Sequence, residues 1–313
     1  MEKYVVDIHH VPKIETRLAA CIGYFDGIHL GHRQLIDKTI DEAKKRGLKS
    51  AMITFHPDPW VVIKNIKKVE HLTTMKDRME IVEKLGIDVW IILNFTKELS
   101  ECDPKQFLDD ILCTLPIDAL IFGYDFRFGF RGQGDGAFLK LHGSRCFDAI
   151  EIEQISDQGE KISSTRISEA IVSGEMETVT RLLDRPFSLS GIVVGGRHKG
   201  REIGFPTANL DYPQEYILPK IGVYIGIADV PQGTFKAMIN IGHNPTFNTR
   251  NEVSIEAYLL DFNDTLYGQK MTLHFLHRIR DEMKFESVQM LIEQMLSDYQ
   301  MTRDYFENHQ SVI

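Results

Sequence analysis

Residues 18–32 read LAACIGYFDGIHLGH, and this stretch decides the fold of the first half of the chain. The five small or apolar residues at 18–22 predict a buried strand, and a glycine-containing turn follows them. After the turn, apolar residues recur at helical spacing: Leu35, Ile36, Ile40 and Ala43. Residues 51–55 then form another apolar run, which predicts a second buried strand. The stretch therefore opens a strand–helix–strand unit of a parallel α/β sheet.

The same alternation continues toward residue 183. Thr74 and Asp77 form a capping pattern that predicts the start of a helix running to Lys84. Further strands are expected at 89–93, 119–122 and 147–152. Further helices are expected at 103–112, 165–173 and 175–183.

The second half has a different character. From Asp184 onward, short alternating segments are separated by Gly, Pro and Asn, and they read GIVVGG, GVYIGIADV, FKAMINIG, SIEAYLL and KMTLHFL. This spacing predicts a small antiparallel barrel. A last helix is expected to present one face made of Val288, Leu291, Ile292, Met295 and Tyr299, with Ser287 as its cap. We place the domain boundary near residues 184–188.

Length and composition agree with two globular domains. The chain has 313 residues, of which 43% are hydrophobic and 26% charged. Acidic residues outnumber basic ones by 45 to 36, whereas proteins that follow a nucleic-acid backbone usually carry a basic field. There is no apolar run of about twenty residues and no signal-peptide pattern, so we expect a cytoplasmic protein with no membrane and no nucleic-acid partner. The sequence carries no indication of an oligomeric state.

The four cysteines show no pattern of a metal site or a disulfide framework. Cys21, Cys102, Cys113 and Cys146 are scattered, and no C-x-x-C pair occurs. This pattern predicts neither a zinc site nor a disulfide, and we expect reduced thiols.

The turn at residues 23–32 is the first candidate for chemistry. Ligands of open parallel sheets bind at the carboxyl ends of strands, and the free amides at a helix N-terminus favour phosphate. Gly27 and Gly31 permit close approach, while His29 and His32 could donate hydrogen bonds to a triphosphate as pyrophosphate leaves. Taken alone, two histidines three residues apart are more often a packed or surface pair.

A second candidate is the segment GIVVGGRHKGREIGFPTAN at residues 191–209. Glycines with basic neighbours could bind phosphate through backbone amides, although the segment is not a P-loop. The alternative is that these glycines only form hairpin turns.

Both segments resemble motifs of one family. GYFDGIHLGH is similar to the extended H-x-G-H signature of FAD synthetases, and GFPTAN to the diagnostic motif of riboflavin kinases. The resemblance to bacterial bifunctional riboflavin kinase/FAD synthetases covers residues 15–305. It implies a Rossmann-like α/β nucleotidyltransferase domain at 1–184, followed at 185–313 by a small antiparallel β-barrel riboflavin kinase domain with a C-terminal helix. Class I aminoacyl-tRNA synthetases carry a related signature, but this chain has little room for an anticodon-binding domain.

In the first domain the resemblance implies two sets of site residues. The residues expected at ATP are Gly23, Phe25, Asp26, Gly27, His29, Gly31, His32, Ser163, Ser164, Thr165 and Arg166. The residues expected at the flavin are Phe55, Pro57, Asp125, Phe126 and Phe128, although aromatic clusters are often only core packing. Ser168 departs from the family pattern, which normally has an arginine there, and Arg166 is the cation that could compensate.

In the second domain the resemblance implies a kinase site. The residues expected at ATP are Gly195, Lys199, Gly204, Pro206, Thr207 and Asn209. Thr207 and Asn209 are also expected to hold Mg²⁺, since both offer hard neutral oxygens. Glu256 is expected to be the catalytic base that the attacking alcohol requires, although an isolated Glu in an alternating strand usually faces solvent.

The implied activity is a two-step synthesis of flavin cofactors. Riboflavin would be phosphorylated by ATP to FMN, and FMN would then be adenylylated by a second ATP to FAD, with Mg²⁺ serving both steps. One alternative is a monofunctional riboflavin kinase whose adenylyltransferase domain is impaired, as the serine at position 168 suggests. Another is a flavin-binding regulator without catalysis, against which the retained catalytic residues argue.

Overall fold

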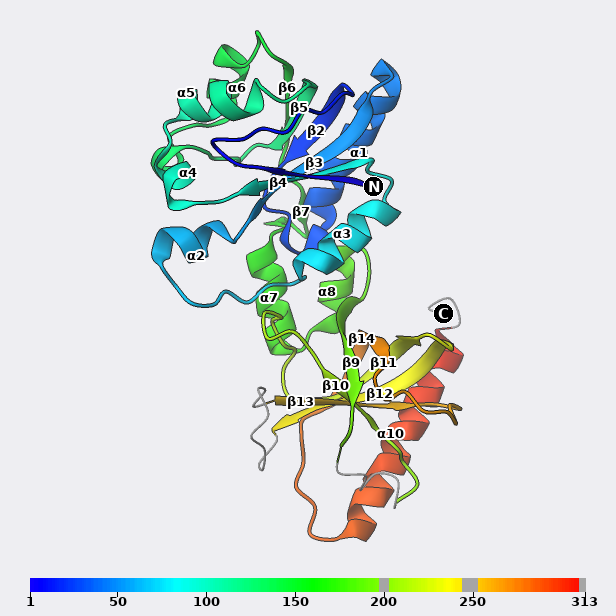
Figure 1. Ribbon diagram of the computed structural model, residues 1–313. Helices are drawn as coiled ribbons and strands as arrows, with labels where there is room; N and C mark the ends of the chain where they lie inside the picture. The colour runs from blue at the N-terminus through cyan, green and yellow to red at the C-terminus, as the bar shows by residue number, and fades with distance from the viewer. Residues whose placement is uncertain (197–202, 244–252, 310–313) are drawn as a thin grey trace. The chain divides into compact units, whose positions relative to one another are not determined.

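The computed structural model describes residues 1–196, 203–243 and 253–309. The chain divides into two compact units, Met1–Ser164 and Thr165–Ile313, and each is described by itself (Figure 1).

The first unit contains a six-stranded sheet in the order β1-β4-β3-β2-β5-β6, and every neighbouring pair is parallel. Its strands are β1 (Glu2–Val6), β2 (Leu18–Ile22), β3 (Lys49–His56), β4 (Val89–Asn94), β5 (Ile117–Gly123) and β6 (Asp148–Ile152). The expected parallel α/β sheet is confirmed. Our expectation that residues 18–22 open the sheet was wrong, because β1 precedes them at the edge and pairs with β4.

Helices cover both faces of this sheet (Figure 1). One face packs against α1 (Leu30–Arg46) and α3 (Met75–Lys84), and the other against α5 (Pro104–Phe107), the π-helix Leu108–Leu112 and α6 (Gly136–His142). Side chains alternate along β2, so that Ala19 and Cys21 enter the first core and Leu18, Ala20 and Ile22 enter the second. The shorter elements are α2 (Pro59–Lys64), α4 (Lys97–Glu101), the 3₁₀ turns Asp26–Ile28 and Phe130–Gly132, and the hairpin β7 (Ser156–Asp157) and β8 (Glu160–Lys161).

The capping pattern that the sequence predicts at α3 is present. The backbone N–H of Asp77 donates to Oγ1 of Thr74 over 3.1 Å, and the N–H of Thr74 donates to Oδ2 of Asp77 over 3.0 Å. This reciprocal capping box satisfies two backbone donors at the start of the helix.

The second unit contains a closed barrel in the order β10-β13-β12-β11-β14-β9. Its strands are β9 (Phe187–Val194), β10 (Ala208–Asp211), β11 (Gly222–Val230), β12 (Gly233–His243), β13 (Val253–Leu259) and β14 (Lys270–Arg280). The predicted antiparallel barrel is confirmed, although β10 was not anticipated. Two helices, α7 (Ser164–Ser173) and α8 (Met176–Leu183), precede the barrel in the chain, and α8 packs against β14 and β9.

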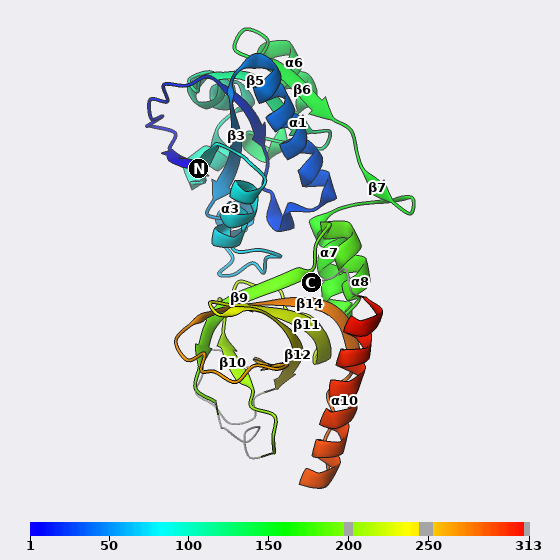
Figure 2. The ribbon, with the colours of Figure 1, turned by 90° about the vertical axis from the view of Figure 1, so that its right-hand side faces the viewer.

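The C-terminal helix α10 (Val288–Asn308) runs along the side of the barrel (Figure 2). Its cap is the predicted one, since the N–H of Met290 donates to Oγ of Ser287 over 3.2 Å. The predicted inward face is only partly correct, because 63% of Val288 is exposed. The residues of α10 that are buried most completely are Asp298, Thr302 and Phe306.

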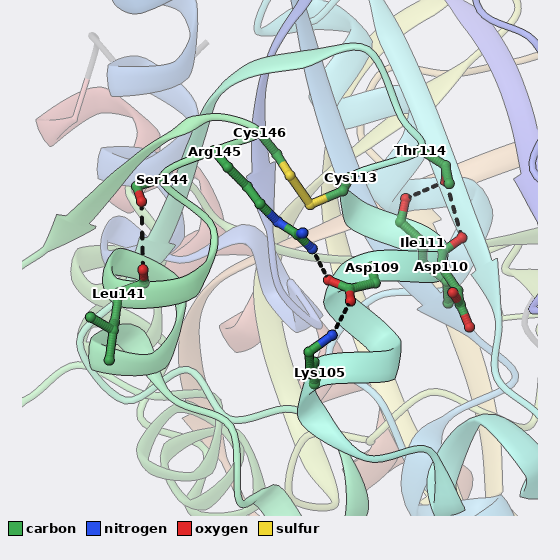
Figure 3. Close-up of a disulfide and its surroundings, with 10 residues drawn as sticks. All are labelled: Lys105, Asp109, Asp110, Ile111, Cys113, Thr114, Leu141, Ser144, Arg145 and Cys146. Carbon is green, nitrogen blue, oxygen red and sulfur yellow. Dashed lines mark hydrogen bonds and ion pairs between the residues drawn. A yellow bond between two sulfur atoms is a disulfide. The ribbon is translucent and has the colours of Figure 1, made fainter.

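The expectation of four reduced thiols was wrong. Cys113 follows the π-helix and Cys146 precedes β6, and the two form a disulfide with a Cα–Cα separation of 5.4 Å (Figure 3). Beside it, Arg145 and Lys105 both form ion pairs with Asp109. Spacing could not reveal this bond because the two cysteines lie 33 residues apart and meet only in the fold. Cys21 and Cys102 are free and buried.

Among the helices in the described ranges, none is long and apolar enough to cross a membrane.

Candidate active sites

The HLGH turn lies at the carboxyl end of β2, where the chain enters α1. His29 is the N-cap of α1, and its Nδ1 accepts a hydrogen bond from the backbone N–H of His32 over 3.3 Å. The two imidazole rings stack with centroids 3.7 Å apart. A Cβ at Gly31 would lie 3.0 Å from the His29 ring, so glycine gives that ring its room. Two histidines are therefore brought together at a helix N-terminus, where phosphate is favoured.

Asp26 of the same turn is a structural carboxylate. It is buried and accepts hydrogen bonds from the backbone N–H groups of Leu72 and Thr73 over 3.1 and 3.2 Å. Nη2 of Arg78, a buried residue of α3, lies 3.5 Å from its Oδ1. These contacts engage both carboxylate oxygens with protein groups, so Asp26 anchors the turn to the segment that precedes α3.

The turn is also tied to Ser164, one of the residues at 163–166 that are predicted to bind ATP. The Ser164 hydroxyl donates to the backbone carbonyl of Asp26 over 3.0 Å, although 138 residues separate them in sequence. The two motifs expected to bind one triphosphate are therefore adjacent in the first unit. Ser163 precedes this contact, and Thr165, Arg166 and Ser168 continue along α7 beyond the division between the units.

Backbone geometry accounts for two more residues of the turn. Gly27 has φ of 81°, and a Cβ there would lie 2.5 Å from Leu72. Phe25 is fully buried in the core beneath α1, where its ring packs edge-on against His32 with centroids 5.2 Å apart. A Cβ at Gly23 would lie 3.2 Å from the Phe25 ring. Phe25 therefore packs beneath the turn in the core and holds Gly23 and His32 in place.

The predicted flavin segment separates into core and surface residues. Phe128 is buried and packs against Phe107 with centroids 5.4 Å apart, while Phe126 is half-buried and stacks on Phe128 at 5.7 Å. Asp125 accepts a charge-assisted hydrogen bond from Nζ of Lys161 over 2.6 Å. This bond is the first cause of the raised pKa of Lys161.

The other predicted flavin residues lie at the end of β3, with Phe55 in the strand and Pro57 directly after it. The Phe55 ring packs edge-on against Phe95 with centroids 5.9 Å apart, and the peptide bond between His56 and Pro57 is cis. Asp58 follows, caps α2 and accepts a hydrogen bond from the hydroxyl of Tyr24. Burial is the main reason that the pKa of this tyrosine is raised.

The barrel brings the predicted kinase residues together. Oγ1 of Thr207 donates to Oε2 of Glu256 over 2.9 Å. Glu256 of β13 pairs in register with Asn209 of β10 on one side and with Asn240 of β12 on the other. Because directly opposed residues share a face of the sheet, Glu256 stands in a row between two amide side chains.

A cavity of about 310 Å³ opens at this row, and all of its lining belongs to the second unit. Thr207, Asn240 and Glu256 form a polar part of its wall. Apolar walls are formed by Ile203, Val223, Met238, Ile239, Tyr258, Met283, Phe285, Leu291 and Met295. A largely apolar pocket with a few convergent polar groups is the usual form of a small-molecule site.

Comparison with known proteins decides the family. A family model for FAD synthetase matches residues 11–166, and one for riboflavin kinase matches residues 183–306. The bifunctional riboflavin kinase/FMN adenylyltransferase of Listeria monocytogenes is 38% identical over 286 residues, with 91% of each chain covered. Proteins of the same name from Bacillus subtilis and Escherichia coli K12 are 35% and 32% identical, each covering 97% of this chain and 98% of the relative.

The chain belongs to the family of bifunctional riboflavin kinase/FMN adenylyltransferases.

One solved structure matches nearly the whole chain. It comes from Streptococcus pneumoniae, its title names a macrolide-efflux protein, and it superposes with a TM-score of 0.86 at 28% identity. The match covers 96% of this chain and 98% of that one, so the fold of this family member agrees with that structure through both units.

Of the residues predicted for the kinase site, Thr207 and Glu256 line the cavity. In the kinase half, Pro206 precedes Thr207, and Gly204 has φ of 86°. Gly195 follows β9, and Lys199 lies outside the described residues.

Three further residues near the candidate sites were not indicated by residue patterns. In the first unit, the side chains of Thr73 and Arg78 fix Asp26. In the second unit, Asp298 lies on the cavity wall beside Arg280, which the family resemblance included without a role. All three of these side chains are buried, and burial is a property of the fold.

Proposed function

We propose that this chain phosphorylates riboflavin with ATP to form FMN and then transfers AMP from a second ATP to FMN, releasing pyrophosphate and FAD. The observation that carries the proposal is the hydrogen bond between Thr207 and Glu256 on the wall of the barrel cavity. It joins the riboflavin kinase motif to a carboxylate that can serve as a base. Family membership, with both family models matched in order, supports the same two activities.

In the kinase reaction, the ribityl 5′-hydroxyl attacks the γ-phosphorus of ATP and ADP leaves. Glu256 accepts the proton that the hydroxyl loses, and the Thr207 hydroxyl orients this carboxylate before the attack. The apolar walls of the cavity suit the flat flavin ring, and they exclude water, which would otherwise compete as the phosphoryl acceptor.

Magnesium belongs to this proposal. Thr207 and Asn209 offer a hydroxyl and an amide oxygen beside the carboxylate of Glu256, and this set of hard oxygens fits Mg²⁺ shared with phosphate. When bound, Mg²⁺ would neutralise negative charge on the phosphates. Gly195, Lys199, Gly204 and Pro206 complete the segment proposed to hold ATP.

In the adenylyltransferase reaction, a phosphate oxygen of FMN attacks the α-phosphorus of ATP and pyrophosphate leaves. His29 and His32, at the N-terminus of α1, donate hydrogen bonds to the phosphates as negative charge grows on the leaving group. Asp26 keeps the turn in place through its buried hydrogen bonds. The remaining ATP residues proposed are Gly23, Phe25, Gly27, Gly31, Ser163, Ser164, Thr165 and Arg166.

The flavin ring of FMN is proposed to lie against Phe55, Pro57, Asp125 and Phe126. Phe126 is half-buried and keeps part of its ring available, whereas Phe128 is buried beneath it and supports it. The domain boundary is proposed at residues 184/185, and the riboflavin kinase match that begins at residue 183 supports it. The two compact units divide earlier, between Ser164 and Thr165, so that most of α7 and all of α8 belong to the second unit. Small-molecule substrates, a cytoplasmic location and the absence of nucleic-acid or membrane partners complete the proposal.

The experiment supplies purified protein with riboflavin, ATP and Mg²⁺ and separates the flavins by chromatography over time. We expect FMN to appear first and FAD to follow. FMN that accumulates without FAD would mean that Ser168 is not tolerated and that the chain is a monofunctional kinase. Neither product, with the flavins bound but unchanged, would mean a flavin-binding regulator.

A further inference from the structure

Tyr24 of the HLGH turn carries a hydroxyl that neither reaction above uses. The residue follows Gly23 at the carboxyl end of β2 and is half-buried. Its hydroxyl donates a hydrogen bond to Oδ2 of Asp58, which lies 34 residues further along the chain and is only 6% exposed. Burial raises the pKa of Tyr24, so the hydroxyl keeps its proton and remains a donor. Since a buried carboxylate is costly, this contact calls for an explanation beyond packing.

Asp58 lies between β3 and α2, at the end of residues 56–58, which we call the flavin loop. Its Oδ1 accepts a hydrogen bond from the backbone N–H of Trp60 over 2.6 Å and so caps α2. The preceding residue, Pro57, follows a cis peptide bond and is one of the residues proposed at the flavin. The two oxygens of one carboxylate therefore hold the backbone that follows the flavin loop and the side chain of the HLGH turn.

A third segment reaches the same hydroxyl. Nδ1 of His71 lies 3.2 Å from the Tyr24 oxygen, and only 12% of the His71 side chain is exposed. A hydroxyl has one proton, and this one is donated to Asp58, so Nδ1 of His71 must donate to the tyrosine oxygen. The three side chains form a chain of hydrogen bonds that runs from the segment before α3, through the turn, to the flavin loop.

The backbone of Tyr24 is held separately from its hydroxyl. Its carbonyl accepts hydrogen bonds from Oγ1 of Thr54 over 3.1 Å and from Nη1 of Arg78 over 3.2 Å. The Arg78 guanidinium also lies over the tyrosine ring, 4.8 Å from its centroid. A phenylalanine at position 24 would keep all of these contacts. Loss of the hydroxyl should therefore disconnect the flavin loop without releasing the turn.

We propose that Tyr24 and Asp58 are positioning residues of the adenylyltransferase site, which hold the flavin loop in place relative to the HLGH turn; this inference rests on the proposed adenylyltransferase function. The reaction requires a phosphate oxygen of FMN to lie in line with the α-phosphorus of ATP. A misplacement of about 1 Å can lower the rate of such a reaction about a hundredfold. A buried hydrogen bond between the segments proposed to hold ATP and FMN limits that misplacement.

The competing explanation is that the hydrogen bond only stabilises the first unit. In that case its loss lowers the unfolding temperature and leaves the kinetics of the folded enzyme unchanged. A positioning role instead changes the kinetic constants of FAD formation at a temperature where the variant is fully folded. The two roles therefore differ in the quantity that they alter.

The test compares Tyr24→Phe, Asp58→Ser and the double variant in the full-length chain. Serine keeps the cap of α2, because serine and aspartate are comparable N-caps, but it is too short to reach Tyr24. FAD formation from supplied FMN, with FMN and ATP varied separately, gives kcat and both KM values. We expect each single variant to lower kcat/KM for FMN about tenfold with the ATP KM nearly unchanged. FMN formation from riboflavin should persist and shows that the second unit is intact.

Tyr4→Phe is the matched control. The Tyr4 hydroxyl donates to Oε2 of Glu2 over 2.9 Å, and both residues lie on the edge strand β1. The variant therefore removes the same kind of hydrogen bond from the same unit. All constants for FAD formation should keep their wild-type values in it.

The double variant tests the connection between the two residues. If they act through each other, Tyr24→Phe/Asp58→Ser loses no more than the larger single loss. Losses that multiply would overturn the proposal, and so would wild-type constants in Tyr24→Phe with a lowered unfolding temperature. Asp58→Ser carries the same prediction, so the test does not depend on one variant folding. Failure of the proposed function itself would look different, because the wild-type chain would then form no FAD from FMN.

Discussion

Thr207 donates a hydrogen bond to Glu256 over 2.9 Å, across 49 residues of sequence. The pairing of β10 with β13 produces this contact, because it sets Asn209 of the first strand opposite Glu256 of the second. A single cross-strand register thus joins the hydroxyl, the amide and the carboxylate that we propose for the phosphoryl transfer.

Glu256→Gln should abolish most FMN formation. The substitution preserves the shape of the side chain and removes its basicity, so we expect kcat for FMN formation to fall about 10²- to 10⁴-fold. Formation of FAD from supplied FMN should be unchanged. Glu282→Gln is the matched control, since Glu282 lines the same cavity and has no assigned proton to accept. Equal losses for the two variants would argue against a specific base at position 256.

His29→Asn should impair FAD formation and leave FMN formation intact. It removes a phosphate donor at the N-terminus of α1, and loss of one such donor typically lowers the rate about 10²- to 10³-fold. We therefore expect FAD formation from FMN to fall by this amount while FMN formation from riboflavin persists. The exposed His9 provides the control, because His9→Asn should affect neither rate. A drop in both activities would indicate general unfolding.

The disulfide predicts a thiol count and a change in stability. Burial raises the pKa of Cys21 to about 12 and that of Cys102 to about 11, so both should resist thiol reagents in the native chain. Denaturation without reductant should expose two reactive thiols, and reduction should expose four. A count of four without reductant would contradict the bond between Cys113 and Cys146.

Loss of this bond should also destabilise the first unit. A closed loop of this length corresponds to about 3–4 kcal/mol in the chain-entropy model. Trp60 and Trp90 are the two tryptophans of the chain and both belong to the first unit, so their fluorescence during urea unfolding measures this difference. The Cys113→Ser/Cys146→Ser variant should match the reduced wild type.

Glu42 should make the first unit sensitive to acid. Its carboxylate accepts hydrogen bonds from Lys38 and Arg46, each over 2.9 Å, and these bonds lower its pKa below the usual 4.5. Because the folded pKa is depressed, the stabilisation is complete above pH 4.5 and is lost as the pH falls through the folded value. Glu42→Gln should therefore cost about 1 kcal/mol at pH 7 and progressively less below pH 4.5.

The matched control for this prediction is Glu101→Gln. Glu101 forms an exposed pair with Lys97 at the same i,i+4 spacing, and such pairs contribute little. Tryptophan-monitored unfolding at several pH values separates the two cases. A constant difference between wild type and Glu42→Gln from pH 7 to pH 3 would contradict the assigned pKa shift.

The sequence predicted the interior of the fold better than its margins. Strands buried on both faces, such as β2, are continuous apolar runs and were located correctly. The edge strand β1 has charged residues at its start and was not recognised. In α10 the apolar period predicted an inward Val288, whereas the buried Asp298 is acceptable there only because β14 supplies Arg280.

The candidate sites show the same limit. Motifs identified Thr207, Glu256 and the two histidines, because these residues lie in short distinctive strings. They could not distinguish a ring that supports the site, such as Phe128, from one that keeps an exposed face, such as Phe126. Nor could they reveal the disulfide, which depends on how two turns that lie 33 residues apart are placed in the fold.

Labelled ATP tests the central claim, that one chain transfers two different parts of ATP, most directly. Riboflavin is supplied with ATP labelled at the γ-phosphorus in one reaction and at the α-phosphorus in another, and the flavins are separated. We predict γ-label in both FMN and FAD and α-label in FAD alone. FAD that carries no α-label, or FMN that carries no γ-label, would contradict the account.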